Sequence, residues 1–142
     1  MVNALILDSS VLVAALRKTE DRHKECLSLM KKVKEGDYVA MEPFTVLVEV
    51  VAAIRRRTGS KEIALKVKRE LLEIDSLNFL DIDKVAAEEA TDIACEIGVR
   101  GMDAIIIQTV KAYGTVLVSL DKEIIECARN IVKVKEVADI RK

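Results

Sequence analysis

The chain has 142 residues and a formal net charge of −1, with 51% hydrophobic and 33% charged residues. This length and composition exclude a disordered chain and two ordinary domains, so we expect residues 1–142 to form a single domain with a sizeable core. The near-zero charge excludes a generally basic nucleic-acid binder, and no apolar run approaches the roughly 20 residues of a membrane-spanning helix.

The first part of the chain predicts two strands and three helices. In chain order we expect a strand at 4–7, a helix that Ser9 or Ser10 caps and that ends at Leu16, a helix at 20–35, a strand at 38–41 and a helix at 43–58. The strands are continuous apolar runs, whereas the helices carry apolar residues on one side. Gly36 and Gly59 follow the second and third helices, where glycine often ends a helix.

The remainder of the chain alternates in the same way. After a capping Ser60 we expect a helix at 61–74, a strand at 78–82, helices at 83–97 and 102–113, a strand at 116–119, a helix at 122–129 and a strand at 132–134. Alternating strands and helices favour an α/β fold with a mostly parallel sheet of about five short strands. Ligands bind such sheets at the carboxyl edge of the strands.

Four acidic residues stand beside apolar segments of the chain: Asp8, Glu49, Asp103 and Asp121. Asp8 and Asp121 both follow predicted strands, so both are expected at the carboxyl edge of the sheet. A carboxylate next to buried surface costs free energy unless something compensates it. Four carboxylates brought together repel one another, and a divalent cation relieves that repulsion, which indicates a metal-dependent enzyme.

Four short stretches resemble the motifs of PIN domains in their order and separation. They are LDSSVLV at 7–13, LVEVVAAI at 47–54, GMDAI at 101–105 and VSLD at 118–121, each with one of the four acids. The resemblance covers nearly the whole chain and is to PIN domains of the VapC type, the toxins of VapBC toxin–antitoxin pairs. It implies a PIN-like three-layer α/β/α fold.

The resemblance also implies a magnesium- or manganese-dependent endoribonuclease that forms a homodimer and binds a small antitoxin protein. Mg²⁺ and Mn²⁺ prefer oxygen ligands, so carboxylates without His or Cys suit them better than zinc. We expect Asp8 and Asp103 to be the main metal ligands and Asp121 to complete the site or hold a second ion. Glu49 is expected to bind a water of the metal and to assist its deprotonation.

Each acid also has a simpler interpretation, which stays open for that residue taken singly. Asp8, Asp103 and Asp121 stand at or near predicted helix starts, where aspartate is favoured as a cap and by the helix dipole. Glu49 alternatively faces solvent from a helix edge. The ordered set of four, together with the resemblance, favours a shared acidic site.

Polar and basic residues near the acids are candidates for supporting roles. Ser9 and Ser119 are expected to orient carboxylates by hydrogen bonding. The candidate contacts to RNA phosphates are Arg100, the run Arg55, Arg56 and Arg57, and also Arg17, Lys18 and Lys122. Arg100 is the first choice because it adjoins the third motif. The alternative for the arginine run at 55–57 is a solvated helix C-terminus, where cations are favoured.

Two other functions compete with a toxin-type endoribonuclease. A PIN-type nuclease in RNA processing or quality control uses the same four acids. A non-catalytic α/β signalling module of the receiver type also gathers carboxylates at a strand edge, but it carries paired acids where Asp8 is followed by Ser9 and Ser10. The apolar residues of 44–54 exceed what one helix face needs for a monomer core, which indicates a dimer or antitoxin interface.

The remaining composition bears on the cellular setting. Cys26, Cys95 and Cys127 are far apart and form no CxxC pair, so we predict buried thiols in helices. Reduced thiols, and the lack of a basic stretch before an apolar N-terminal segment, predict the cytoplasm. One glutamine and three asparagines, against many Lys, Glu, Ile and Val, resemble the composition of hyperthermophile proteins.

Overall fold

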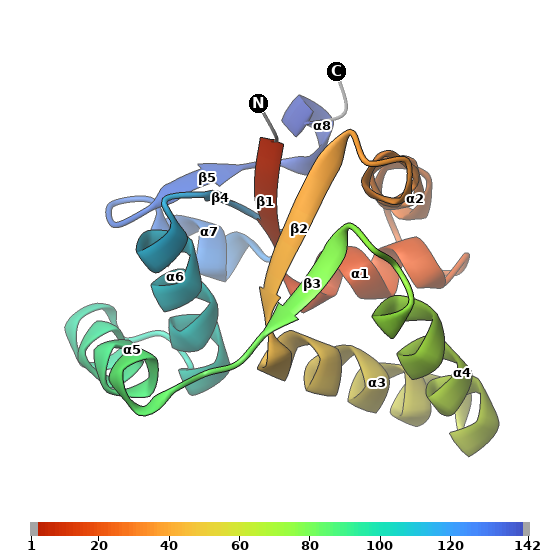
Figure 1. The fold of residues 1–142 in the computed structure, drawn as a ribbon, viewed down its shortest axis with the longest axis horizontal. Coiled ribbons are helices and arrows are strands. Elements are labelled where there is room, and N and C mark those ends of the chain that lie inside the picture. Colours follow the sequence, from red (N-terminus) through yellow and green to blue (C-terminus); the bar gives the residue numbers. More distant parts are fainter. Residues whose placement is uncertain (1–2, 141–142) are drawn as a thin grey trace.

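A computed structural model of the protein describes residues 3–140 (Figure 1). Its strands are β1 (Asn3–Leu7), β2 (Tyr38–Pro43), β3 (Leu77–Leu80), β4 (Val116–Val118) and β5 (Lys133–Lys135). Its helices are α1 (Ser9–Leu16), α2 (His23–Lys34), α3 (Phe44–Thr58), α4 (Lys61–Leu72), α5 (Lys84–Ile97), α6 (Gly101–Tyr113), α7 (Lys122–Ala128) and α8 (Val137–Ile140). No helix in this part of the chain is both long and apolar enough to cross a membrane.

The strands form one sheet in the order β3-β2-β1-β4-β5, and every pairing is parallel. The chain moves outward from β1 through β2 to β3 and then returns to place β4 on the other side of β1. This reversal creates a topological switch point between β1 and β4, the place where α/β sheets bind ligands. Leu7 pairs with Val118, so Asp8 and Ser119 leave the sheet side by side.

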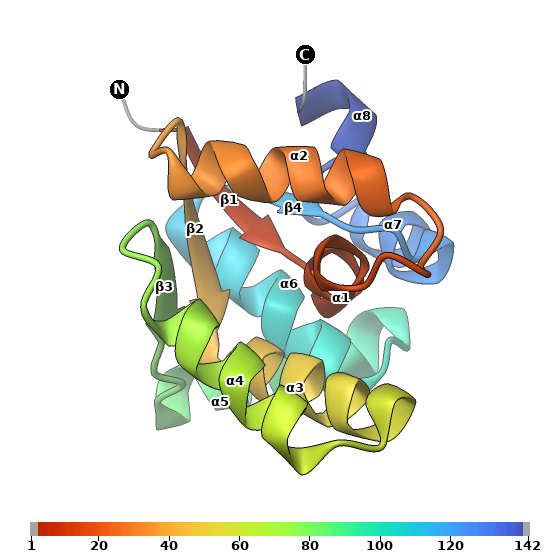
Figure 2. The same ribbon diagram turned by 90° about the vertical axis from the view of Figure 1, so that its right-hand side faces the viewer.

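Helices cover both faces of the sheet, which gives three layers (Figures 1 and 2). α1 and α2 lie on one face, and α6 lies on the other, where it contacts β1, β2 and β4 and packs against α5. This change of face follows from the reversal of strand order, because strand crossovers are right-handed. α3 begins where β2 ends, and the α3–α4 pair extends beyond the sheet at the lower right of Figure 1.

Aliphatic side chains of the central strands and the adjoining helices form the core. Ile6 and Leu7 of β1, Leu117 of β4 and Ile106 and Ile107 of α6 are all 0% exposed. A strand buried on both faces is a continuous apolar run, which explains the pattern of β1. Burying each such side chain contributes about 1.5–3 kcal/mol, so this packing fixes the carboxyl ends of β1 and β4 in place.

Several element ends differ from the sequence prediction. Asp8 caps α1 in place of Ser9 or Ser10, because its carboxylate accepts the Ser9 N–H at 2.9 Å. α2 begins at His23, later than predicted, and β2 continues to Pro43 because it pairs with β3 along its second half. The predicted α/β fold with a parallel sheet of five strands is confirmed, and every strand pairing is parallel. α8 was not predicted because it is only one turn long.

The cysteine prediction is confirmed for one residue and wrong for another. Cys26 is buried in α2, Cys127 is half-buried and Cys95 is exposed. Cys95 faces water because α5 turns its opposite side, with Ala90 and Ile93, into the fold. All three are free thiols.

Candidate active site

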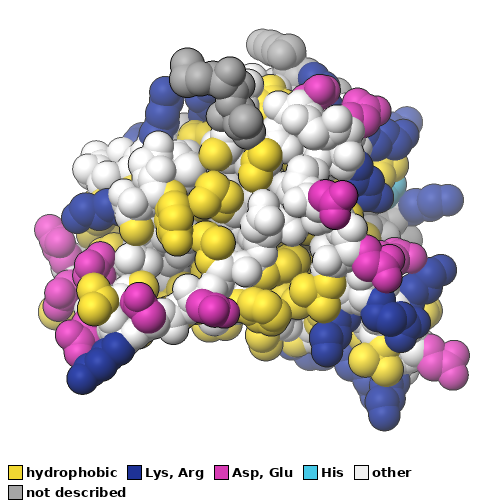
Figure 3. Space-filling view, viewed as in Figure 1, with side chains coloured by type: hydrophobic (Ala, Val, Ile, Leu, Met, Phe, Trp, Pro, Cys, Tyr) yellow, Lys and Arg dark blue, Asp and Glu magenta, His cyan; other side chains and the backbone are white. Residues whose placement is uncertain are grey.

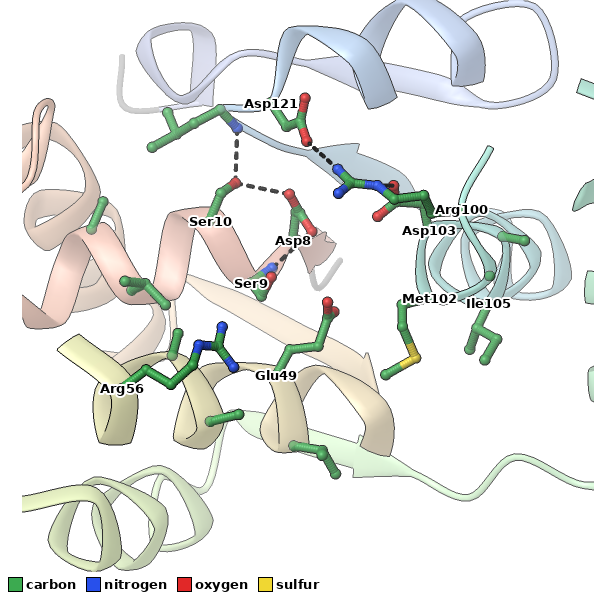
Figure 4. Close-up of a pocket in the computed structure, with 18 of the residues that line it drawn as sticks. Asp8, Ser9, Ser10, Glu49, Arg56, Arg100, Met102, Asp103, Ile105 and Asp121 are labelled. Atoms are coloured by element: carbon green, nitrogen blue, oxygen red, sulfur yellow. Dashed lines mark hydrogen bonds and ion pairs between the residues drawn. The ribbon is translucent and has the colours of Figure 1, made fainter. Parts of the chain in front are cut away.

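A cleft of about 1230 Å³ opens at the carboxyl edge of the sheet, beside the switch point. All four predicted acids line it, and they come from four different segments (Figure 4). Asp8 follows β1, Glu49 lies on α3, Asp103 is in the first turn of α6 and Asp121 precedes α7. The fold therefore gathers these carboxylates from distant parts of the chain into one cavity.

Asp8 is the most firmly held of the four. Its Oδ1 accepts the Ser9 N–H at 2.9 Å, and its Oδ2 accepts the hydroxyls of Ser10 and Ser119, each at 2.8 Å. The Asp8 backbone N–H donates to Val118 O at 2.9 Å, and only 5% of the residue is exposed. Three donors on one carboxylate compensate its burial and fix its orientation.

The two serine hydroxyls also tie the end of β1 to the end of β4. Ser119 Oγ accepts the Asp121 N–H at 2.9 Å, and Ser10 Oγ accepts the Leu120 N–H at 3.2 Å. The α1 hydroxyl that reaches Asp8 belongs to Ser10 rather than to Ser9, which contributes its backbone N–H. The signal for Ser10 was its spacing, because a residue two positions after an N-cap lies within reach of the capping side chain.

Glu49 points into the cleft from α3 as a half-buried carboxyl group (Figure 4). Its Oε1 has no hydrogen-bond partner among residues 3–140. Burial, together with the charges of Asp8 and Asp103, raises the pKa of Glu49 to about 7, against the opposing effect of Arg100. A carboxyl group that titrates near neutral pH is suited to accept a proton in a reaction.

Arg100 bridges two of the acids. Its Nε lies 3.7 Å from Asp103 Oδ2, and its Nη2 lies 3.5 Å from Asp121 Oδ2 (Figure 4). Burial and the charge of Asp8 raise the pKa of Asp103, and the Arg100 charge offsets part of this effect. The carboxyl groups of the cleft thus disfavour one another's ionised forms, and the Arg100 charge relieves part of this repulsion.

A fifth carboxyl group, that of Glu42, is not among the predicted site residues. Glu42 is fully buried in β2, and its Oε2 accepts the Leu7 N–H at 2.7 Å, one residue before Asp8. Burial raises the pKa of Glu42 well above its usual value. The backbone pairing of β1 with β2 ends at Leu5 and Ala40, so this side chain takes over from the ladder. A charged residue in an apolar strand was the only signal for it.

The structure places only some of the predicted basic residues in the cleft. Arg100 lines it, and so do Arg56 and Arg57 of the predicted arginine run. Among residues 3–140, those lining the cleft do not include Arg55, Arg17 or Lys122. Successive side chains of a helix point about 100° apart, so the members of the run at 55–57 face different directions.

Residues 5–130, most of the chain, match the family described as the PIN domain. The protein belongs to the PIN-domain family. This membership confirms the resemblance seen in the four motifs and removes the receiver-type alternative. A sequence comparison with curated proteins finds no match.

Solved structures of toxin–antitoxin proteins share this PIN-domain fold. VapC20 from Mycobacterium tuberculosis, a sarcin-ricin loop cleaving toxin, has a TM-score of 0.73 and 18% identity, covering 84% of this chain and 92% of that one. VapBC2 from Rickettsia felis, bound to a promoter DNA fragment, has a TM-score of 0.67 and 17% identity, covering 94% of this chain and 98% of that one. A toxin–antitoxin complex from Klebsiella pneumoniae has a TM-score of 0.68 and 15% identity, covering 94% of this chain and 97% of that one. At these identities the likeness concerns the fold.

The carboxylates of this PIN domain suit a hard divalent cation in their chemistry. They supply only oxygen donors, and the unpartnered Oε1 of Glu49 is free to accept a ligand or a water. As they stand, however, no three His, Cys, Asp or Glu side chains within residues 3–140 are arranged to hold one ion. The Arg100 guanidinium lies between Asp103 and Asp121.

Proposed function

We propose that this PIN domain is a metal-dependent endoribonuclease that hydrolyses RNA phosphodiester bonds, as the toxin of a toxin–antitoxin pair. The observation that carries the proposal is the convergence of Asp8, Glu49, Asp103 and Asp121 on one cleft at the switch point of the sheet. Carboxylates in this number, without His or Cys, suit Mg²⁺ or Mn²⁺. Membership of the PIN-domain family supports the same conclusion.

Each acid has a role that follows from its surroundings. Asp8 and Asp103 are the main ligands, because Asp8 is rigidly oriented and Asp103 faces it across the cleft, and Asp121 completes the site. A bound Mg²⁺ or Mn²⁺ would neutralise phosphate charge and stabilise the leaving oxygen. Glu49, with its pKa of about 7, accepts a proton from the attacking water. Ser119 and Ser10 position Asp8 through their hydroxyl groups.

RNA reaches the cleft along its basic side chains. Arg100 and Arg56, which line the cleft together with the acids, contact backbone phosphates of the RNA in this proposal. Arg55, Arg17 and Lys122 lie outside it and suit contacts with more distant phosphates. Cleavage of a sarcin-ricin loop by VapC20, a protein of the same fold, supports RNA as the substrate class.

The protein surface offers sites for an antitoxin and for a second copy of the chain. Phe44 and Val48 of α3 are 41% and 58% exposed. On the face of the molecule seen in Figure 1, Figure 3 shows hydrophobic side chains gathered in the lower middle. Structures of the same fold include toxin–antitoxin complexes. We therefore propose a homodimer that binds a small antitoxin in the cytoplasm. The composition further suggests a thermophilic source, which a melting midpoint in the ordinary mesophile range would contradict.

RNA cleavage with and without added Mg²⁺ or Mn²⁺ tests the activity. We expect chelation of the metal, or either of the substitutions Asp8→Asn and Asp103→Asn, to reduce cleavage by about 100-fold or more. Asp92→Asn is the matched control, because Asp92 is an exposed residue of α5 that does not line the cleft. Full cleavage in the presence of chelator would refute the metal-dependent mechanism. A small open reading frame for an antitoxin next to the gene would separate a toxin from an RNA-processing nuclease.

A further inference from the structure

Arg100 occupies an unusual place for a substrate-binding residue. It immediately precedes α6, and its guanidinium group contacts Asp103 Oδ2 at 3.7 Å and Asp121 Oδ2 at 3.5 Å. Both partners are residues that the proposed function assigns to the metal. The side chain of Arg100 is 73% exposed, whereas those of Asp103 and Asp121 are 17% and 34% exposed. A long, water-accessible cation therefore reaches in from the rim to two carboxylates of the cleft (Figure 4).

We propose that Arg100 is an internal counter-ion that competes with the divalent cation for Asp103 and Asp121, and that the cation must displace it. This inference rests on the proposed function. It accounts for the arrangement of these two acids, because the guanidinium lies between their carboxylates. Departure of the guanidinium lets both carboxylates turn toward a shared ion.

The contacts of Arg100 are of a kind that a metal ion can break. Both distances exceed the 2.7–2.9 Å of a strong charge-assisted hydrogen bond. Ion pairs of exposed side chains are individually weak, because water screens them and the long side chain loses freedom in forming them. Arg100 thus keeps the repulsion among the acids low in the metal-free protein without blocking the site.

Displacement also gives Arg100 a second partner. A guanidinium group released from the two carboxylates remains at the rim of the cleft, where it can bind a phosphate of the RNA in a bidentate manner. Substituting Arg100 by a neutral residue therefore has opposite effects on the two affinities. Removing the guanidinium should tighten metal binding and weaken RNA binding, a combination that a purely structural role for Arg100 does not produce.

Titration of the metal-free protein with Mn²⁺ in the absence of RNA, followed by calorimetry, tests the inference. We expect Arg100→Gln to bind Mn²⁺ about three- to tenfold more tightly than the wild type, the size expected for loss of weak ion pairs. Arg56→Gln is the matched control, because it removes the same charge from the same cleft on the α3 side. It should change the affinity for Mn²⁺ much less. Arg100→Met serves as a second variant if Arg100→Gln does not fold.

The outcomes separate this inference from the proposed function. Equal tightening in the Arg100 and Arg56 variants would reduce the effect to overall charge and overturn the inference, as would unchanged or weaker Mn²⁺ binding by the Arg100 variants. In either case a wild type that binds Mn²⁺ and cleaves RNA leaves the proposed function standing. A wild type that neither binds Mn²⁺ nor cleaves RNA would overturn both.

Discussion

At the scale of single residues, Glu49 makes the stability of the metal-free protein depend on pH. Its pKa is about 7 in the folded protein, above the usual 4.5, so between these values the folded state binds more protons than the unfolded state. Stability therefore falls as the pH rises through this window and is constant above it. We expect the wild type to lose about 1–2 kcal/mol of unfolding free energy across this window, and Glu49→Gln to lack this loss. The value is reduced because water screens the charge of a half-buried group.

Urea unfolding of the wild type and of Glu49→Gln at several pH values between 4.5 and 7 measures this difference. Glu42 and Asp103 have raised pKa values as well, so part of the pH dependence should persist in the variant. Identical pH profiles for the two proteins would show that Glu49 does not titrate in this window.

Two substitutions of Asp8 distinguish a structural role of its carboxylate from a catalytic one. Asparagine keeps an oxygen that caps α1, and the hydroxyl groups of Ser10 and Ser119 can rotate to accept from its amide group. Asp8→Asn should therefore fold with little change in stability, whereas Asp8→Ala should lose about 1–3 kcal/mol because it leaves the buried Ser119 hydroxyl without its acceptor. Chemical denaturation measures both variants, and unfolding of Asp8→Asn would point to a mainly structural carboxylate.

At the scale of elements, Gly59 ends the helix that carries Glu49. Its φ is +68°, and a Cβ at this position would have no heavy atom within 4 Å. Strain of the left-handed backbone is then the only penalty for a side chain, so Gly59→Ala should cost about 1 kcal/mol and Gly59→Asn less. Gly101→Ala is the control, because that site is equally open but has no positive φ. Thermal melting measures all three, and equal losses would exclude backbone strain as the cause.

The helices and strands of this fold were largely predictable, and so were two of the four acids. Asp8 and Asp121 follow apolar strands, and the carboxyl ends of parallel strands share one edge. Glu49 lies on a helix, so only the path of the crossover decides where it points, and the PIN-domain resemblance supplied that information. Glu42 could not be placed, because its partner Leu7 lies far along the chain. Arg100 was expected beside the third motif, but its ion pairs with Asp103 and Asp121 could not be predicted, because they depend on the conformation of a long side chain.

At the scale of the whole molecule, the exposed apolar residues of α3 bear on assembly. Val48 is 58% exposed on the helix for which a dimer or antitoxin interface is predicted. We expect light scattering to find a dimer for the wild type and a monomer for Val48→Glu, because a desolvated charge disfavours an apolar interface. Leu65→Glu, at a residue of α4 that is 41% exposed, is the control and should remain dimeric. A wild type that stays monomeric at high concentration would contradict the homodimer.

The insertion of β4 beside β1 has a consequence for synthesis of the protein in the cell. Ser119, whose hydroxyl group holds Asp8, is 111 positions away from it along the chain. A growing polypeptide that has emerged only as far as β3 has Asp8 and Glu49 but neither Asp103 nor the strand that closes the sheet next to β1. The four carboxylates of the proposed active site are therefore brought together only after most of the chain has been synthesised.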